Sequence, residues 1–134
     1  MSDHITIIKL KKAVANTIDF EETHTLDLHL KYKGEFAAFN GRLDSIDKRL
    51  SNIINTGKKL TKNRFPVIVK NKTIKNYFTD ESNYWGTVID EMINEKESED
   101  SFYFRFVTKW KNDIDKTIEF IDSTKDDEVI LLSV

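Results

Sequence analysis

Residues 36–53, FAAFNGRLDSIDKRLSNI, carry an apolar series whose successive members lie three or four positions apart. That spacing places all of them on one narrow stripe of a helix, which suits docking on a sheet or pairing with a second helix. The members are Phe36, Phe39, Leu43, Ile46, Leu50 and Ile53. We therefore predict a helix over this stretch, and its first five apolar residues would support a homodimer if they are exposed.

The pair Asn40-Gly41 supports a rival interpretation of the same stretch. Asn-Gly is a strong turn signal, and glycine inside a helix costs about 1 kcal/mol relative to alanine. The alternative is a turn at Lys33-Gly34, a short strand from Phe36 to Phe39, and a helix that begins near Asp44. We favour the long helix, ending at a left-handed cap on Gly57, because the apolar spacing runs through Gly41 without a break.

On either side of this stretch, short apolar or alternating runs predict strands. Residues 4–10 are rich in β-branched types, and residues 25–33 alternate apolar and polar positions. Residues 13–20 alternate less clearly. Residues 65–69 form a short strand that Pro66 places near an edge or at a strand start. Residues 129–134 form a last strand, which we expect to return to the sheet.

Two further helices are predicted in the second half of the chain. One begins at Thr79 or Asp80 and runs to about Lys96, with Tyr84, Trp85, Val88, Ile89, Met92 and Ile93 toward the core. The other begins at residues 98–100 and runs to Ile121, with Tyr103, Val107, Trp110, Ile114 and Ile118 at helical spacing. The aromatic run 102–106 would suit a strand equally well.

Composition bounds the class of protein. The 134 residues are 39% hydrophobic and 33% charged, with four Gly, one Pro and no Cys, enough for one domain with its own core and without disulfides. We expect a small single α+β domain over residues 1–134, with an N-terminal antiparallel meander and a C-terminal strand packed against about three helices. No signal peptide or membrane span is evident, so a cytoplasmic protein is expected.

Charge is segregated along the chain although the net charge is only -2. The basic set is Lys58, Lys59, Lys62, Arg64, Lys70 and Lys72, followed by Lys75. The acidic set includes Asp90, Glu91, Glu95 and Glu99. Such blocks either steer charged partners or neutralise each other across the fold, and we favour neutralisation.

The acidic set indicates a basic protein partner, as in inhibitors and immunity proteins, because complementary charge speeds association and fixes register. The basic set, with the rings of Tyr77 and Phe78 and a ring face on 102–106, would suit single-stranded nucleic acid. The sequence pI of about 5.9 counts against that alternative.

No residue pattern in the chain specifies a reaction. His24 and His29 would point to opposite faces of one strand, whereas Asp27 and His29 share a face but lack further ligands. We therefore expect no metal and no cofactor, and a metal-dependent enzyme is the third hypothesis. The leading prediction is a non-catalytic binder of another protein, an inhibitor or immunity-type factor of a bacterial or phage system.

Overall fold

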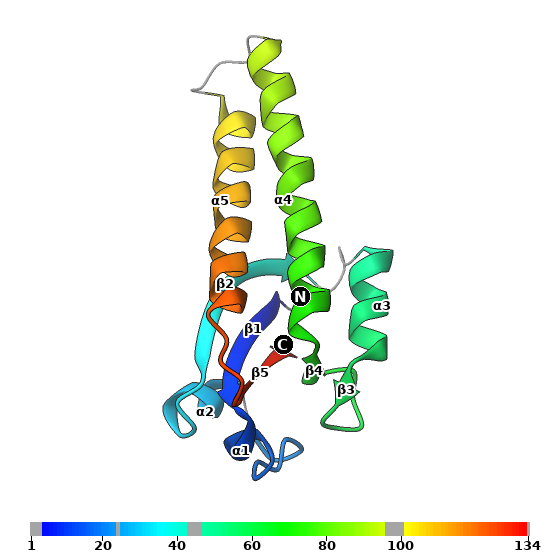
Figure 1. The fold of residues 1–134 in the computed structure, drawn as a ribbon, viewed down its shortest axis with the longest axis vertical. Helices are drawn as coiled ribbons and strands as arrows, with labels where there is room; N and C mark the ends of the chain where they lie inside the picture. Colours follow the sequence, from blue (N-terminus) through cyan, green and yellow to red (C-terminus); the bar gives the residue numbers. More distant parts are fainter. Residues whose placement is uncertain (1–3, 24, 43–46, 96–100, 134) are drawn as a thin grey trace.

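An antiparallel sheet with strand order β2-β1-β5-β4-β3 forms one end of the molecule in this computed structural model (Figure 1). The structure describes residues 4–23, 25–42, 47–95 and 101–133. The strands are β1 (His4–Lys11), β2 (Glu35–Arg42), β3 (Lys58–Lys59), β4 (Val67–Val69) and β5 (Glu128–Ser133). The β5 strand lies between β1 and β4, so the last strand of the chain joins its first strand to β4.

The helices differ greatly in length. They are α1 (Lys12–Ala15), α2 (Thr25–Leu30), α3 (Lys48–Thr56), α4 (Asn71–Asn94) and α5 (Phe102–Asp122). The two long helices, α4 and α5, pack side by side as a hairpin whose upper half extends well beyond the sheet (Figure 1). The protein is therefore a small α+β fold with a projecting helical hairpin.

Both faces of the sheet are covered, which explains why β1, β4 and β5 carry apolar residues toward both faces. Ile5 and Ile7 of β1 belong to the core cluster that includes buried residues of α3, α4 and α5. Ile8 and Leu10 belong to a second cluster with residues of the α1–α2 segment. Because neighbouring residues of a strand face opposite ways, a strand buried on both sides needs apolar residues at nearly every position.

One charged side chain lies inside the first face. Lys9 is 3% exposed, and its Nζ donates a 2.6 Å hydrogen bond to Ser123 Oγ. The same Nζ lies 4.2 Å from the centroid of the Phe120 ring. The hydrogen bond and the cation–π contact together compensate part of the cost of removing this charge from water.

The predicted helix over residues 36–53 is wrong. The rival interpretation is correct in outline, but its strand extends from Glu35 to Arg42 and its helix begins at Lys48, not near Asp44. Phe36 and Phe39 lie in β2, which pairs antiparallel with β1, whereas Leu50 and Ile53 lie in α3. Asp47 caps α3, because its Oδ1 accepts a 2.7 Å hydrogen bond from the Leu50 N–H. The strand forms because β1, buried on both faces, needs a hydrogen-bonding partner at this edge.

The strand predicted over 25–33 is also wrong, since residues 25–30 form α2. Leu28 is 2% exposed but Leu30 is 68% exposed, so the alternating leucines do not share a buried face. The weak alternation over 13–20 did not produce a strand either, because residues 12–15 form α1. In both segments alternation alone did not separate a strand from a helix.

The other elements are largely as predicted. Strands at 4–10, 65–69 and 129–134 are confirmed as β1, β4 and β5, with Pro66 immediately before β4. The helix predicted from Thr79 or Asp80 begins earlier, at Asn71. The helix alternative for residues 102–106 is correct, with Ser101 as the N-cap through its hydroxyl and the Phe104 N–H.

Gly57 ends α3 without the predicted left-handed cap, since its φ is -73°. A Cβ at this position would lie 2.6 Å from Val67 Cγ2 and 2.7 Å from the Ile68 carbonyl oxygen. Glycine is needed here because α3 ends in close contact with β4, where a side chain has no room.

Candidate functional site

The two helices of the hairpin are joined by a polar seam along one side. Ser82 Oγ donates a hydrogen bond of 2.5 Å to Asp115 Oδ1, and Lys111 Nζ lies 2.8 Å from Asp115 Oδ2. Burial alone would raise the pKa of Asp115, but the hydrogen bonds from Lys111 and Ser82 outweigh it and lower that pKa. Gly86 continues this side, since a Cβ there would lie 3.3 Å from Lys111 Cε.

Helical geometry places a second group of residues on the opposite side of the hairpin. Tyr84 follows Ser82 by two positions, which is about half a turn of α4. Phe106 precedes Asp115 by nine positions, which is about two and a half turns of α5. Both rings therefore lie away from the polar seam. Ile93 follows Ser82 by about three whole turns and lies on the seam side.

The side away from the seam carries exposed aromatic rings. Tyr84 is 60%, Phe102 80%, Tyr103 55% and Phe106 52% exposed. The Phe102 and Phe106 rings are stacked, with centroids 6.4 Å apart, and Val88 lies half-buried one turn after Tyr84. We call Tyr84, Val88, Phe102, Tyr103 and Phe106 the aromatic face of the hairpin.

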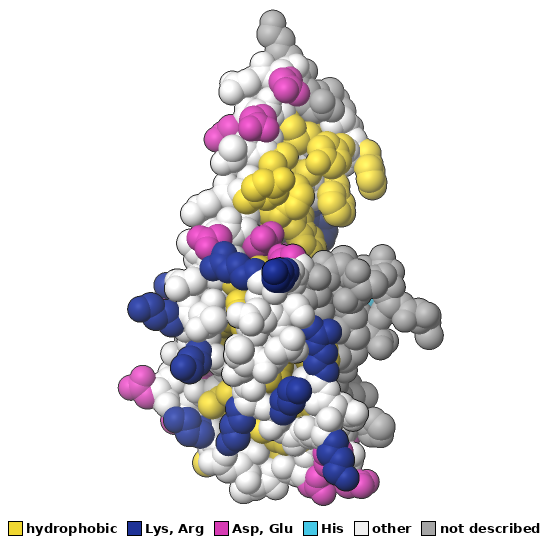
Figure 2. All heavy atoms as spheres, turned by 90° about the vertical axis from the view of Figure 1, so that its right-hand side faces the viewer, with side chains coloured by type: hydrophobic (Ala, Val, Ile, Leu, Met, Phe, Trp, Pro, Cys, Tyr) yellow, Lys and Arg dark blue, Asp and Glu magenta, His cyan; other side chains and the backbone are white. Residues whose placement is uncertain are grey.

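Figure 2 shows apolar side chains gathered as one patch on the upper hairpin, with acidic side chains above and below it. A fully exposed aromatic side chain offers ~150–250 Å², so the exposed fractions of the four rings amount to about 500 Å². The largest apolar patch on a typical monomer is about 300–600 Å² and is often functional. The aromatic face is therefore at the upper end of what a protein leaves uncovered.

Glutamates line the α4 edge of the aromatic face. Glu81, Glu91 and Glu95 continue the spacing of Tyr84 and Val88 by steps of three and four, so the five residues share one stripe of the helix. Glu91 and Glu95 are exposed, and no ion pair joins either of them to another described residue. Glu81 is half-buried; burial, and then the Asp47 charge, raise its pKa.

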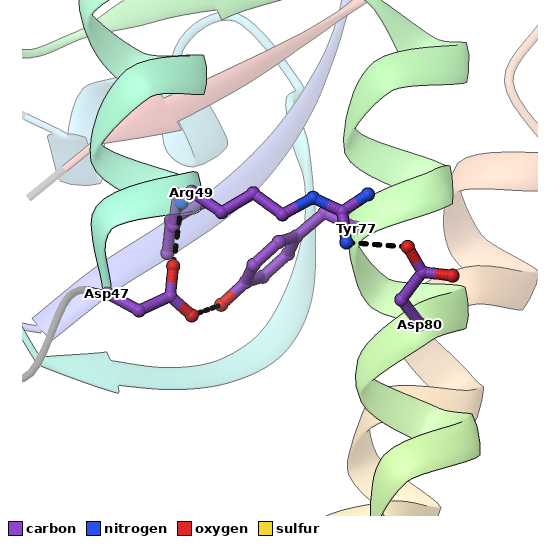
Figure 3. A network of polar contacts seen from close by, with 5 residues as sticks. Asp47, Arg49, Tyr77 and Asp80 are labelled. Atoms are coloured by element: carbon purple, nitrogen blue, oxygen red, sulfur yellow. Dashed lines mark hydrogen bonds and ion pairs between the residues drawn. The ribbon is translucent and has the colours of Figure 1, made fainter.

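A polar network anchors the base of the hairpin to α3 (Figure 3). Tyr77 OH donates a 2.7 Å hydrogen bond to Asp47 Oδ2, the carboxylate that also caps α3. Arg49 reaches across from α3 to Asp80, with Nη1 2.5 Å from Oδ2, and its guanidinium lies 5.7 Å from the Tyr77 ring centroid. These contacts hold the lower part of α4 in place while its upper part projects.

The predicted acidic set lies on the projecting part. Asp90, Glu91 and Glu95 are exposed on the upper part of α4 or at its end, whereas Glu99 lies outside the described residues. Lys72 is near the start of the same helix, about 28 Å from Glu91 along the axis at 1.5 Å per residue. That distance exceeds the Debye length of about 8 Å, so Lys72 and Glu91 do not neutralise each other.

The predicted basic set lies at the sheet end of the molecule. Lys58 and Lys59 form β3, and Lys62 and Arg64 follow in the loop before β4. Lys58 and Lys70 line an open groove of about 580 Å³, which Glu128 also lines, and Lys72 is exposed in the first turn of α4.

The rings expected beside this basic set are not available for stacking. Tyr77 is 6% and Phe78 is 1% exposed, and both belong to the first core cluster. Residues 102–106 are in α5, not in a sheet that could extend a ring platform. The charged component of a nucleic-acid surface is therefore present, but the aromatic component predicted for it is absent from these positions.

The residues predicted for self-association do not form one stripe. Phe36 and Phe39 are in β2, with Phe36 partly buried against the second core cluster, and Leu50 is 3% exposed in α3. Leu43 and Ile46 lie outside the described residues. Apart from Leu30 of α2, the large apolar side chains that are exposed among the described residues lie on α4 and α5 instead.

Among the described residues, no group of three or more His, Cys, Asp or Glu side chains is arranged to hold a metal ion. Asp27 lies in α2, so it and position 29 are two helical positions apart and do not share a face as they would on a strand. Within the same described ranges, no helix is long and apolar enough to cross a membrane.

Comparison with protein-family models, curated protein sequences and solved structures finds no match to this chain. The aromatic face must therefore be interpreted from its own geometry and chemistry.

Sequence reasoning missed this face because it assigned Tyr84 to the core and expected an exposed ring face over 102–106 only on a strand. One signal could have found it: α5 has rings at 102, 103, 104, 106 and 110, which spread over more than half of the helix circumference. A helix that contacts neighbours on only part of its circumference must leave some of those rings exposed.

Proposed function

We propose that this protein is a non-catalytic binder of another protein and that the aromatic face of the α4–α5 hairpin is its contact surface. The observation that supports this most strongly is the exposure of four rings on one side of a projecting hairpin. Burying them on a partner would recover the hydrophobic free energy that the fold leaves unused, about 25 cal/mol per Å² of apolar area.

The composition and size of the face agree with this proposal. Tyrosine and other aromatic side chains are enriched at protein interfaces and supply many of their hot spots. About 500 Å² of exposed ring surface, together with the glutamates and backbone around it, approaches the ~800 Å² that each partner contributes to a standard interface.

A stoichiometric inhibitor or immunity-type factor of a bacterial or phage system is the role we propose for such a binder. The chain presents its largest apolar surface on a projecting element and not in an enclosed cavity, which suits contact with a macromolecule better than conversion of a small substrate.

The test is affinity capture from lysate of the native cells with the full chain, after nuclease treatment. Tyr84→Ser/Phe106→Ser removes two rings of the face, and Ile93→Ser is the matched control because Ile93 is 56% exposed on the seam side. We expect wild type and Ile93→Ser to retain one protein in stoichiometric amount and the double variant to lose it. Equal capture by all three would contradict the proposal.

Nucleic-acid binding through Lys58, Lys59, Lys62, Arg64, Lys70 and Lys72 is the alternative that the same experiment separates. Phosphate contacts make binding strongly salt-dependent, and nuclease would abolish recovery. Nuclease-sensitive capture that survives Tyr84→Ser/Phe106→Ser but fails after Lys58→Glu/Lys62→Glu would favour the basic set over the aromatic face.

A further inference from the structure

We propose that the partner presents a basic amphipathic segment to the hairpin, with apolar side chains on the aromatic face and Lys or Arg side chains along Glu81, Glu91 and Glu95. This inference rests on the proposed function and adds the chemistry of the partner. It follows from the way charge and apolar surface are combined on α4.

The α4 stripe carries carboxylates and apolar side chains but no cation. From Glu81 through Tyr84 and Val88 to Glu91 and Glu95, its described members are acidic, aromatic or aliphatic. Two lysines of α5 are already engaged, Lys109 with Asp113 and Lys111 with Asp115. No described lysine or arginine forms an ion pair with Glu91 or Glu95, so a partner's cations can pair with them.

Desolvation makes such pairing necessary. A partner that covers the aromatic face removes water from the adjoining glutamates, and a buried carboxylate without a hydrogen-bonding cation is strongly unfavourable. Lys or Arg side chains at the edge of the partner segment would satisfy these carboxylates and also speed the encounter.

The same charges argue against a second copy of this chain as the occupant. A symmetric dimer places the same patch of both copies face to face, so each glutamate stripe would meet or adjoin the other. Like charges brought together in a desolvated interface cost free energy, and the stripe contains no lysine or arginine to offset this.

The first experiment selects a displayed library of random peptides against the full chain at low salt. We expect the enriched peptides to combine aromatic or aliphatic residues with several Lys or Arg. We also expect the best of them to bind Tyr84→Ser/Phe106→Ser at least about 30-fold more weakly than wild type, as for loss of interface hot spots. Binding to Ile93→Ser should be unchanged. Circular dichroism verifies that each variant is folded.

The second experiment measures association of the best peptide by stopped-flow fluorescence. Glu91→Gln/Glu95→Gln should slow association about tenfold at low salt, and the difference should disappear at high salt because screening removes steering. Glu22→Gln/Asp126→Asn is the matched control, since it changes the net charge equally at exposed positions on the sheet end. Unchanged association of the Glu91/Glu95 variant would overturn the inference.

The outcomes separate this inference from the proposed function. Enrichment of neutral or acidic peptides whose binding still requires the aromatic face would overturn the inference of a basic partner. It would leave the proposal of a protein-binding aromatic face intact. No enriched peptide, or peptides indifferent to Tyr84→Ser/Phe106→Ser, would overturn both. A concentration-dependent dimer in light scattering that the double variant abolishes would identify a second copy as the occupant and overturn the basic partner.

Discussion

At the scale of single residues, Asp47 connects two elements. One carboxylate oxygen accepts from the Leu50 N–H and caps α3, and the other accepts from the Tyr77 hydroxyl of α4. Because Tyr77 is buried and its hydroxyl donates to a carboxylate, ionisation of the phenol is strongly disfavoured, and its pKa is raised far above the ordinary value.

Tyr77→Phe tests this link through the dependence of stability on pH. Near pH 7 we expect the variant to be about 1 kcal/mol less stable, because it loses a partly buried hydrogen bond. The raised folded-state pKa means that the stabilising contribution of Tyr77 is complete below the unfolded pKa of about 10 and falls as pH rises above it.

Denaturant unfolding of both proteins between neutral and strongly alkaline pH measures this effect. The difference in unfolding free energy should be constant below about pH 9 and should shrink, then reverse, as pH passes 10. A difference that stayed constant through the alkaline range would mean that the phenol ionises equally easily in the folded and unfolded chains.

At the scale of elements, two glycines at helices should respond oppositely to alanine. Gly57→Ala should destabilise the protein by 1 kcal/mol or more, about the size of other overpacking changes, because the Cβ would collide with Val67 and with the Ile68 carbonyl. Neither contact can be relieved by moving a flexible chain end. Thermal unfolding measures the loss, and an unchanged midpoint would show that α3 does not press on β4 as described.

Gly86→Ala should instead stabilise the protein by up to about 1 kcal/mol. Gly86 is inside α4, where alanine has the higher helix propensity, and the nearest heavy atom to the added Cβ is Lys111 Cε at 3.3 Å. A lysine methylene can move by a few tenths of an ångström at little cost. The thermal unfolding midpoints of Gly86→Ala and Gly57→Ala, each compared with wild type, measure the two opposite effects. A lower midpoint for Gly86→Ala would mean that Lys111 cannot move to make room for the added methyl group.

Elements were predicted correctly from the sequence where the local apolar pattern matched the burial of those residues in the fold. The central parts of β1 and β5, residues 5–10 and 129–132, are mostly apolar because the sheet is covered on both faces, and that pattern is visible without a structure. The stretch 36–53 was mispredicted because its three-and-four spacing spans a strand and a separate helix by coincidence. What decides β2 is the open edge of β1, which local spacing cannot reveal.

The functional surface was harder to predict than the fold for a related reason. Apolar residues at helical spacing in the helix predicted from Thr79 or Asp80 were assigned to the core, which is where Met92 lies. Tyr84 and Phe106 also carry large apolar side chains but are 60% and 52% exposed. The upper half of the hairpin extends beyond the sheet (Figure 1). Whether an apolar stripe is buried depends on the length of the helix relative to its neighbours, and the sequence does not state that relation.

At the scale of the whole molecule, stability should decrease along the hairpin from the sheet to its projecting end. Buried residues of α4 are concentrated in its first half, at Ile74, Tyr77, Phe78 and Ser82, with Met92 alone beyond them among the described residues. In α5, Ile114, Thr117 and Ile121 are buried in the half nearer the sheet, whereas Val107 is the buried residue of the other half and the first turn is mostly exposed.

Native-state hydrogen exchange measures this gradient directly. Amides of residues 74–82 and 112–121 should exchange only by global unfolding, and those of 86–94 and 105–109 should open locally at lower free energy, because few apolar contacts hold them. Binding of a basic peptide to the aromatic face should raise protection at 86–94 and 105–109 and leave the base unchanged. Uniform protection along both helices in the free protein would mean that the upper hairpin is already stable without a partner. Binding of a partner to the exposed rings would then not be needed to stabilise it.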